Sequence, residues 1–155
     1  TKYDTVLQQL DARSEIKTQD LVDLGMIDTS VVSQFEKNCN SDTTVQVNDS
    51  IYYSIIRTSD KDGICSYFFL TSINRKRQEA VASQYLHPDC DVDFSSDTYQ
   101  LYEHFIASKD EIEVIHTTIF QKKNRVSADE EQNIDRKQTK KGLITISQTG
   151  QINAK

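Results

Sequence analysis

Residues 21–35, LVDLGMIDTSVVSQF, combine a short apolar helix, a stop signal and a restart. The first four residues supply one apolar helical turn, and Gly25 follows at the position where a left-handed residue most readily closes a helix. Asp28 or Thr29 can cap a second helix by accepting hydrogen bonds from its free N–H groups. The apolar residues up to Phe35 supply the buried face of that helix. The pattern is typical of a docking module, and no catalytic motif accompanies it.

The segments around this pair predict a further helix and a β-hairpin. Four apolar residues near the N-terminus follow the helical spacing i, i+3, i+4 and i+7, which predicts a helix over residues 2–13. They are Tyr3, Val6, Leu7 and Leu10. Residues 51–56 and 64–70 are dense in β-branched and aromatic side chains, and an Asp-Gly step between them suits a hairpin. Because both faces of these strands are apolar, we expect them in the centre of a sheet covered by helices on at least one side.

The rest of the chain completes an α/β (α+β) prediction. Helical spacing predicts helices over residues 74–85, ended near Pro88, and 97–107, whereas residues 112–120 favour a strand. We therefore expect N-terminal helices followed by a small mixed sheet packed with helices, as a single layered domain. This domain spans residues 1–120, helical over 1–38 and strand-rich with helices over 44–120. Residues 121–155 read as a polar linker or tail with a short strand at 143–147.

Composition and charge narrow the function classes. The chain has 155 residues and a formal net charge of −6, whereas a wide nucleic-acid footprint needs a basic surplus. No apolar run reaches the roughly 18–20 residues that cross a bilayer, so we expect no direct membrane insertion. Three scattered cysteines form an odd set, which favours reduced thiols in the cytoplasm over a disulfide scaffold.

The sequence predicts no catalytic, cofactor-binding or metal-ligating residues. A phosphate-binding loop is absent, and the four glycines do not fit a dinucleotide-binding fingerprint. His87 precedes Cys90 by three residues, which is zinc-ligand spacing, but no second pair exists. Residues 89–93 have the carboxylate spacing of a calcium loop without its glycine or its final glutamate. The three histidines, which include His104 and His116, are interpreted as structural.

Leu21-Val22-x-x-Gly25-x-Ile27-x-Thr29-x-x-Val32-x-x-Phe35 resembles the helix pair in the N-terminal domain of type IV pilus assembly and type II secretion ATPases. In that family a β section, a helix, a short strand and a second helix follow. The ranges 51–72, 75–85, 91–94 and 97–105 fit that order here. The resemblance covers residues 18–107.

This resemblance implies a non-catalytic docking domain linked to an ATPase motor outside the chain. The implied partner is the cytoplasmic part of an inner-membrane platform protein, so the domain would be cytoplasmic, peripheral at the inner membrane through its partner. The candidate partner-binding residues come from the helix pair and a basic cluster. They are Leu21, Leu24, Gly25, Ile27, Arg75, Lys76 and Arg77. Some family members bind cyclic di-GMP through an Arg-Leu-Gly triplet, but Ile16, Lys17 and Thr18 stand there, which argues against that ligand.

Two alternatives stay open. The chain could be a stand-alone adaptor or secretion chaperone-like protein, which predicts a homodimer through one apolar face. It could also be a small-ligand sensor, with Tyr52, Tyr53 and Tyr67 giving polar groups on aromatic walls. A thermal-shift screen would separate a sensor from an interaction module.

Overall fold

The computed structural model, which describes residues 1–30, 34–125 and 130–155, is a mainly β protein. Strands account for 56% of the structure and helices for 14%, so the predicted α/β class with helices packed throughout the sheet is wrong. In chain order the elements are α1 (Lys2–Ala12), β1 (Glu15–Lys17), α2 (Thr18–Asp23), β2 (Asn38–Gln46), β3 (Ile51–Ser59), β4 (Cys65–Asn74), β5 (Glu79–Cys90), β6 (Thr98–Ser108), β7 (Glu111–Gln121), a 3-10 turn (Glu131–Asn133), β8 (Ile134–Ile146) and β9 (Ile152–Ala154).

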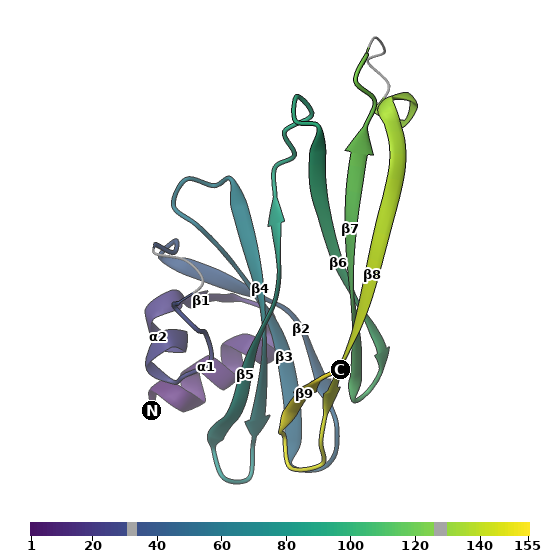
Figure 1. The fold of residues 1–155 in the computed structure, drawn as a ribbon. Coiled ribbons are helices and arrows are strands. Elements are labelled where there is room, and N and C mark those ends of the chain that lie inside the picture. The colour runs from purple at the N-terminus through teal and green to yellow at the C-terminus, as the bar shows by residue number, and fades with distance from the viewer. Residues whose placement is uncertain (31–33, 126–129) are drawn as a thin grey trace.

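The first five strands form one antiparallel sheet in the order β1-β2-β3-β4-β5 (Figure 1). The strands predicted over residues 51–56 and 64–70 are confirmed as β3 and β4, and they pair along their full length. Their alternating side chains enter two cores: Ile56 and Phe69 pack on the helix side, whereas Ile55 and Leu70 pack on the opposite side. Apolar residues on both faces therefore mark a sheet covered on both sides. The sequence predicted cover by helices on at least one side, and helices cover one of the two.

Two N-terminal helices cover one face of this sheet (Figure 1). Val6 and Leu10 of α1 and Leu21 of α2 are fully buried against it. The predicted first helix is confirmed, and Gly25, with φ of 72°, stands just after α2 in the left-handed conformation. The helix expected to follow Asp28 falls largely on residues 31–33, which lie outside the described residues. Neither α1 nor α2 has the length and hydrophobicity that a membrane span requires.

The last four strands form a second antiparallel sheet in the order β6-β7-β8-β9. Its lower part covers the other face of the first sheet, where Ile112, Ile144 and Ile146 pack on Tyr53 and Leu70. The upper part projects beyond the five-stranded sheet (Figure 1). We name this projection the arm and define it as residues 98–103, 116–121 and 134–141, which pair across β6, β7 and β8.

The helices predicted over residues 74–85 and 97–107 are strands β5 and β6. In β5, the register slips by one residue at Val81 and again at Leu86, which is the mark of two β-bulges. Ala80 and Tyr85 consequently pack on the helix side while Val81 and Leu86 pack on the other side. The bulges interrupt the period-2 pattern of a strand, so the apolar spacing imitates that of a helix.

The residues predicted as a linker or tail contain most of the longest strand. β8 pairs with β7 from Ile134 to Thr145, so the expected boundary at residue 120 falls inside one sheet. The short strand expected over 143–147 is the end of β8. A polar strand of this kind forms because β7 supplies backbone hydrogen bonds on one side, although few of its side chains are buried.

Candidate interaction surface

The outer face of the four-stranded sheet, turned away from the five-stranded sheet, exposes large apolar side chains. Tyr102 and His104 of β6 point inward, where their rings contact His87. Because side chains alternate along a strand, Leu101 and Phe105 point outward, and they are 44% and 51% exposed. Of the five large hydrophobic side chains exposed in the described residues, four lie between positions 94 and 106. Leu101 and Phe105 share one exposed face with Glu103 between them, and exposed apolar side chains gathered on one face are typical of a contact surface.

Strand register shows how this face is built. Phe105 stands opposite Glu113, which stands opposite Leu143. In the next row Ile115 of β7 has Glu103 on one side and Lys141 on the other. Lys141 Nζ also lies 3.9 Å from Glu113 Oε1. We name the four apolar residues the outer apolar face: Leu101, Phe105, Ile115 and Leu143. An acidic residue borders it on the β6 side and a basic residue on the β8 side.

The two long edges of this sheet differ in charge. β9 pairs only with the last residues of β8, so residues 134–141 have β7 as their sole described neighbour in the sheet. That free edge carries Arg136, Lys137, Lys140 and Lys141. Lysines on an exposed edge discourage unwanted strand pairing. The edge strand on the other side, β6, contains no lysine or arginine. Positive charge therefore does not discourage strand pairing at the β6 edge.

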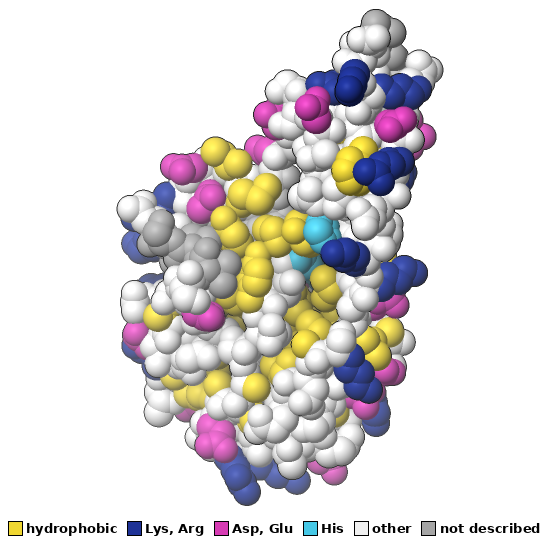
Figure 2. Space-filling view, in the orientation of Figure 1, with side chains coloured by type: hydrophobic (Ala, Val, Ile, Leu, Met, Phe, Trp, Pro, Cys, Tyr) yellow, Lys and Arg dark blue, Asp and Glu magenta, His cyan; other side chains and the backbone are white. Residues whose placement is uncertain are grey.

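A pair of histidines joins the two sheets at the base of the arm. His87 of β5 is 3% exposed, and its Nε2 lies 2.8 Å from Nδ1 of His104 on β6. His87 Nδ1 lies 2.7 Å from the carbonyl oxygen of Pro88, which can only accept a hydrogen bond. Nδ1 of His87 therefore carries the proton, and its Nε2 accepts from His104 Nδ1–H. Histidine side chains are visible at this junction, beside a band of hydrophobic side chains (Figure 2).

Burial favours the neutral form of both histidines. Desolvation lowers the pKa of His87, and its hydrogen bond to Pro88 only partly offsets that effect. Desolvation and the neighbouring His87 lower the pKa of His104, while Asp42, whose Oδ2 lies 3.8 Å from His104 Nε2, acts in the opposite direction. None of the contacts found for the described residues joins either histidine to a serine, threonine or cysteine. The pair therefore lacks the nucleophile that acyl-transfer chemistry needs.

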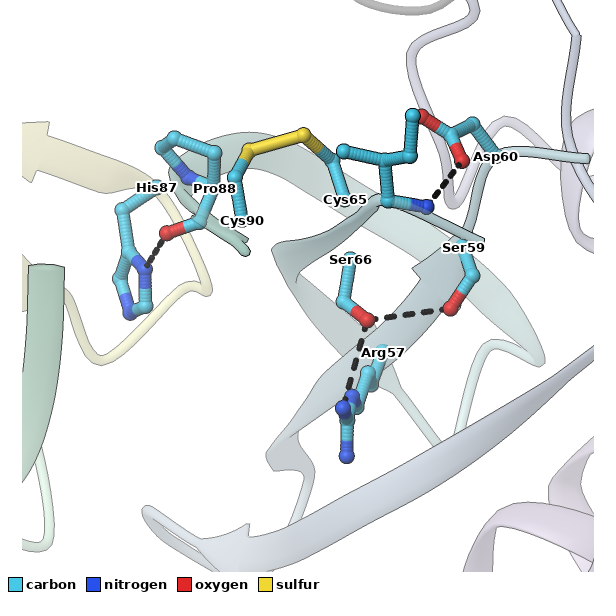
Figure 3. Close-up of a disulfide and its surroundings, with 9 residues drawn as sticks. Arg57, Ser59, Asp60, Cys65, Ser66, His87, Pro88 and Cys90 are labelled. Atoms are coloured by element: carbon cyan, nitrogen blue, oxygen red, sulfur yellow. Dashed lines mark hydrogen bonds between the residues drawn. A yellow bond between two sulfur atoms is a disulfide. The ribbon is translucent and has the colours of Figure 1, made fainter. Parts of the chain in front are cut away.

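Two of the three cysteines form a disulfide, so the prediction of reduced thiols is wrong for them. Cys65 of β4 and Cys90 of β5 are register partners and are bonded, close to Pro88 and His87 (Figure 3). The third, Cys39, is a buried free thiol, and burial raises its pKa to about 11. A thiol of that pKa is almost entirely protonated at neutral pH and is a poor nucleophile. Within the described residues, no cluster of three or more metal-ligating side chains is found.

The structure separates the predicted partner-binding residues. Leu21 and Ile27 belong to the core under the sheet, while Leu24 is half-buried and Gly25 is exposed. Arg75 forms a bidentate ion pair with Asp11 and covers the Tyr52 ring at 4.0 Å, so it holds α1 to the sheet. Lys76 and Arg77 are exposed in the β4–β5 turn. The helix pair and the basic cluster therefore do not form one surface.

The outer apolar face was missed because its two β6 residues were assigned to the buried side of a helix over 97–107. The residues Leu101, Tyr102, Phe105 and Ile106 fit that helical spacing. The structure places Tyr102 on the inner face of a strand and Leu101 and Phe105 on the outer face. No local signal in the sequence separates these two outcomes, because both assign the same apolar residues to a regular element.

Comparison with known proteins finds no relative. No family model matches the chain, and no curated protein or solved structure matches it. The resemblance to pilus and secretion ATPases thus stays a prediction from the residues. Two of the helices on which its element order depended are strands β5 and β6.

Proposed function

We propose that this chain is a non-catalytic protein-interaction module that associates with a second copy of itself through the outer apolar face. The observation that carries the proposal is the exposure of Leu101 and Phe105 on a regular sheet face. Each of the two is already about half buried, so a contact that covers it completely gains about half of the roughly 1.5–3 kcal/mol that full burial of such a side chain contributes.

The charges around the face favour a copy of the chain as the partner. A twofold axis parallel to the strands, placed between two facing sheets, brings β6 of one copy over β8 of the other. Phe105 then meets Leu143 of the second copy, and Glu103 meets its Lys141. Both contacts occur twice. Ile115 and Glu113 of β7 lie on the axis and face their own copies, and each Glu113 is paired with Lys141 of its own chain. The face is therefore complementary to itself in charge at its two edges.

The disulfide bears on where this role is performed. Disulfides between strands persist in oxidising compartments and are rare in the cytosol. The bond between Cys65 and Cys90 therefore supports an oxidising compartment for this module, in place of the predicted cytoplasmic location. Docking to a cytoplasmic platform protein of a pilus or secretion system remains the prediction of the resemblance alone, and the disulfide weighs against it.

Sedimentation velocity over a wide range of protein concentration tests the proposal. We expect the wild-type chain to pass from monomer to dimer as concentration rises, and Phe105→Glu to remain monomeric because it buries a charge in the contact. Ile64→Glu is the matched control, since Ile64 is 54% exposed but belongs to the β3–β4 turn. It should dimerise like the wild type.

A charge exchange makes the test specific to the proposed axis. Glu103→Lys should weaken the dimer by placing two lysines together, and the double variant Glu103→Lys, Lys141→Glu should restore it. A chain that is monomeric at every concentration would overturn the proposal. Equal weakening by Phe105→Glu and Ile64→Glu would also overturn it, because the contact would then not lie on this face.

A further inference from the structure

Four hairpin turns converge at the end of the molecule opposite the arm. The β2–β3, β4–β5 and β8–β9 turns lie side by side there (Figure 1). Together with Lys109 of the β6–β7 turn they enclose a hollow of about 780 Å³. That volume lies within the range of about 300–1,000 Å³ typical of small-molecule sites. A rigid sandwich that presents several turns at one end is a common arrangement for a binding site.

Hydrogen bonds between the turns hold the hollow open. Asn48 Nδ2 of the β2–β3 turn donates to the Gln148 carbonyl of the β8–β9 turn at 2.9 Å. Asn48 Oδ1 accepts from the backbone N–H of Ser50, and the Ser50 carbonyl accepts from Arg75 N–H of the β4–β5 turn, both at 2.9 Å. Three turns are thus joined, the β2–β3 and β4–β5 turns through their backbones and the β8–β9 turn through the Asn48 side chain. A site fixed in this way loses little conformational entropy when a ligand binds.

One residue beside the wall requires glycine. Gly150, in the β8–β9 turn, has φ of 92°, and a Cβ there would lie 3.1 Å from the Val81 side chain of β5. Its carbonyl accepts a hydrogen bond from the buried Ser72 hydroxyl at 2.5 Å. The β8–β9 turn is therefore seated closely on the five-stranded sheet, which fixes the position of the neighbouring lining residues.

The lining is polar and has more positive than negative side chains. Lys76, Arg77 and Lys109 supply three cations, against the two carboxylates of Asp49 and Glu79. The contacts of the described residues give Lys76 and Lys109 no ion pair, and Arg77 lies only 4.0 Å from Glu79. Lys and Arg side chains gather at this end of the molecule (Figure 2). In a chain whose net charge is −6, this local excess of positive charge differs from the average surface.

The chemistry of the remaining lining narrows the ligand. Apart from three aliphatic side chains the wall consists of amide, hydroxyl and charged groups, and it contains no aromatic ring. A flat hydrophobic ligand or a stacked base would find no partner there. We infer that this hollow binds a small hydrophilic polyanion whose phosphate or carboxylate groups pair with Lys76, Arg77 and Lys109. The site shares no residue with the outer apolar face, so it is independent of the proposed self-association.

Isothermal titration calorimetry with pyrophosphate and with citrate as probes tests this inference. We expect at least one probe to bind with one-to-one stoichiometry and to bind more weakly as salt rises. The double variant Lys76→Gln, Lys109→Gln should weaken binding by about tenfold or more, because it removes two charge-assisted contacts. The matched control is Lys137→Gln, Lys140→Gln, which removes the same charge from the arm and should leave binding unchanged.

The two probes also separate phosphate from carboxylate ligands, since the tighter binder identifies the anion class. Backbone NMR gives the location: amide shifts should change at Asn48, Lys76 and Gln148 and stay constant in the arm. Failure of both probes to bind would overturn the inference. So would equal loss of binding in the two double variants, because attraction would then depend on net charge and not on the hollow.

Discussion

The five-stranded sheet and the arm are built from the same antiparallel ladders, but they differ in what covers them. Helices cover one face of the five-stranded sheet and the lower part of the second sheet covers the other. The arm extends past both layers, and most of its side chains are exposed or half-buried. Backbone pairing, with few buried side chains such as Ile119 and Gln121, therefore extends a sheet into solvent here. The free energy of folding comes mainly from the covered region.

Charge follows the same division. Residues 1–97 contain nine Lys or Arg against sixteen Asp or Glu, whereas residues 98–155 contain nine against eight. The acidity of the chain thus belongs to the helix-covered part. The second sheet is nearly balanced, so a second copy can approach its outer face without strong repulsion.

A pair of phenylalanine truncations compares a side chain of the covered five-stranded sheet with one on the outer apolar face of the second sheet. Phe69 of β4 is fully buried and packs on Phe35 and Tyr85, so Phe69→Ala should lower the free energy of unfolding by about 3–5 kcal/mol. Phe105→Ala should change it by less than about 0.5 kcal/mol when the chain is monomeric. Urea denaturation at low protein concentration gives both values. Similar losses in the two variants would mean that the outer apolar face is part of the core.

Removal of the disulfide should cause the next largest loss in the free energy of unfolding. Cys65 and Cys90 are 25 residues apart, and closing a loop of that length stabilises the fold by about 3.5 kcal/mol through the unfolded chain. The variant Cys65→Ser, Cys90→Ser should lose roughly that amount in urea denaturation.

Thiol counting controls this measurement. Without reductant, a thiol reagent should label no cysteine in the folded wild type and one, Cys39, after unfolding. Labelling of three thiols in the unfolded protein would mean that the bond does not form, and the stability prediction would then fail with it.

The covered region was the part that its sequence predicted best. β3 and β4 carry apolar side chains on both faces, and only a covered strand tolerates that pattern. α1 was predicted from a regular apolar stripe, and its end at Arg13 in the left-handed conformation completes the helix. In these elements local preference, periodicity and burial agree.

The sequence predictions for β5, β6 and β8 were wrong, each for a different physical reason. Bulges at Val81 and Leu86 hid the period of β5, and β6 has apolar residues on a face that no other element covers. Between them, Pro88 was predicted to end a helix but lies in β5, an edge strand of its sheet, where a missing N–H is tolerated. β8 was assigned to a linker because a strand paired at a free edge needs few buried side chains.

Contacts between distant strands could not be predicted at all. The disulfide and the His87–His104 pair depend on which strands become neighbours, and the sequence prediction assigned both histidines to the wrong context. His104 was placed in the helix predicted over residues 97–107, and His87 was placed beyond the end of the helix predicted over residues 74–85. The turn-end hollow likewise needs four turns to meet, although Lys76 and Arg77 were already candidates for contact.

Acid should weaken the junction between the two regions. Its effect on the free energy of unfolding should be smaller than that of the Phe69 truncation or of disulfide removal. The pKa values of His87 and His104 are lowered from 6.5 by burial, although Asp42, Asp89 and Glu103 partly offset this. Below about pH 6.5 the unfolded chain therefore binds protons that the folded chain does not, and stability falls as pH falls. We expect a slope of up to about 1.4 kcal/mol per pH unit for each histidine until the folded pKa is reached.

Urea denaturation between about pH 7.5 and 5.5, above the titration of ordinary carboxylates, isolates this slope. The variant His87→Gln should reduce the slope of the free energy of unfolding against pH. This holds even if the variant is less stable, because the slope depends on the difference in bound protons and not on the absolute free energy. His116→Gln is the control, since His116 bonds Gln100 on the arm and removing it keeps the buried pair. A wild-type slope of zero, or a slope that His87→Gln leaves unchanged, would mean that protons do not act at the contact joining the arm to the covered sheet.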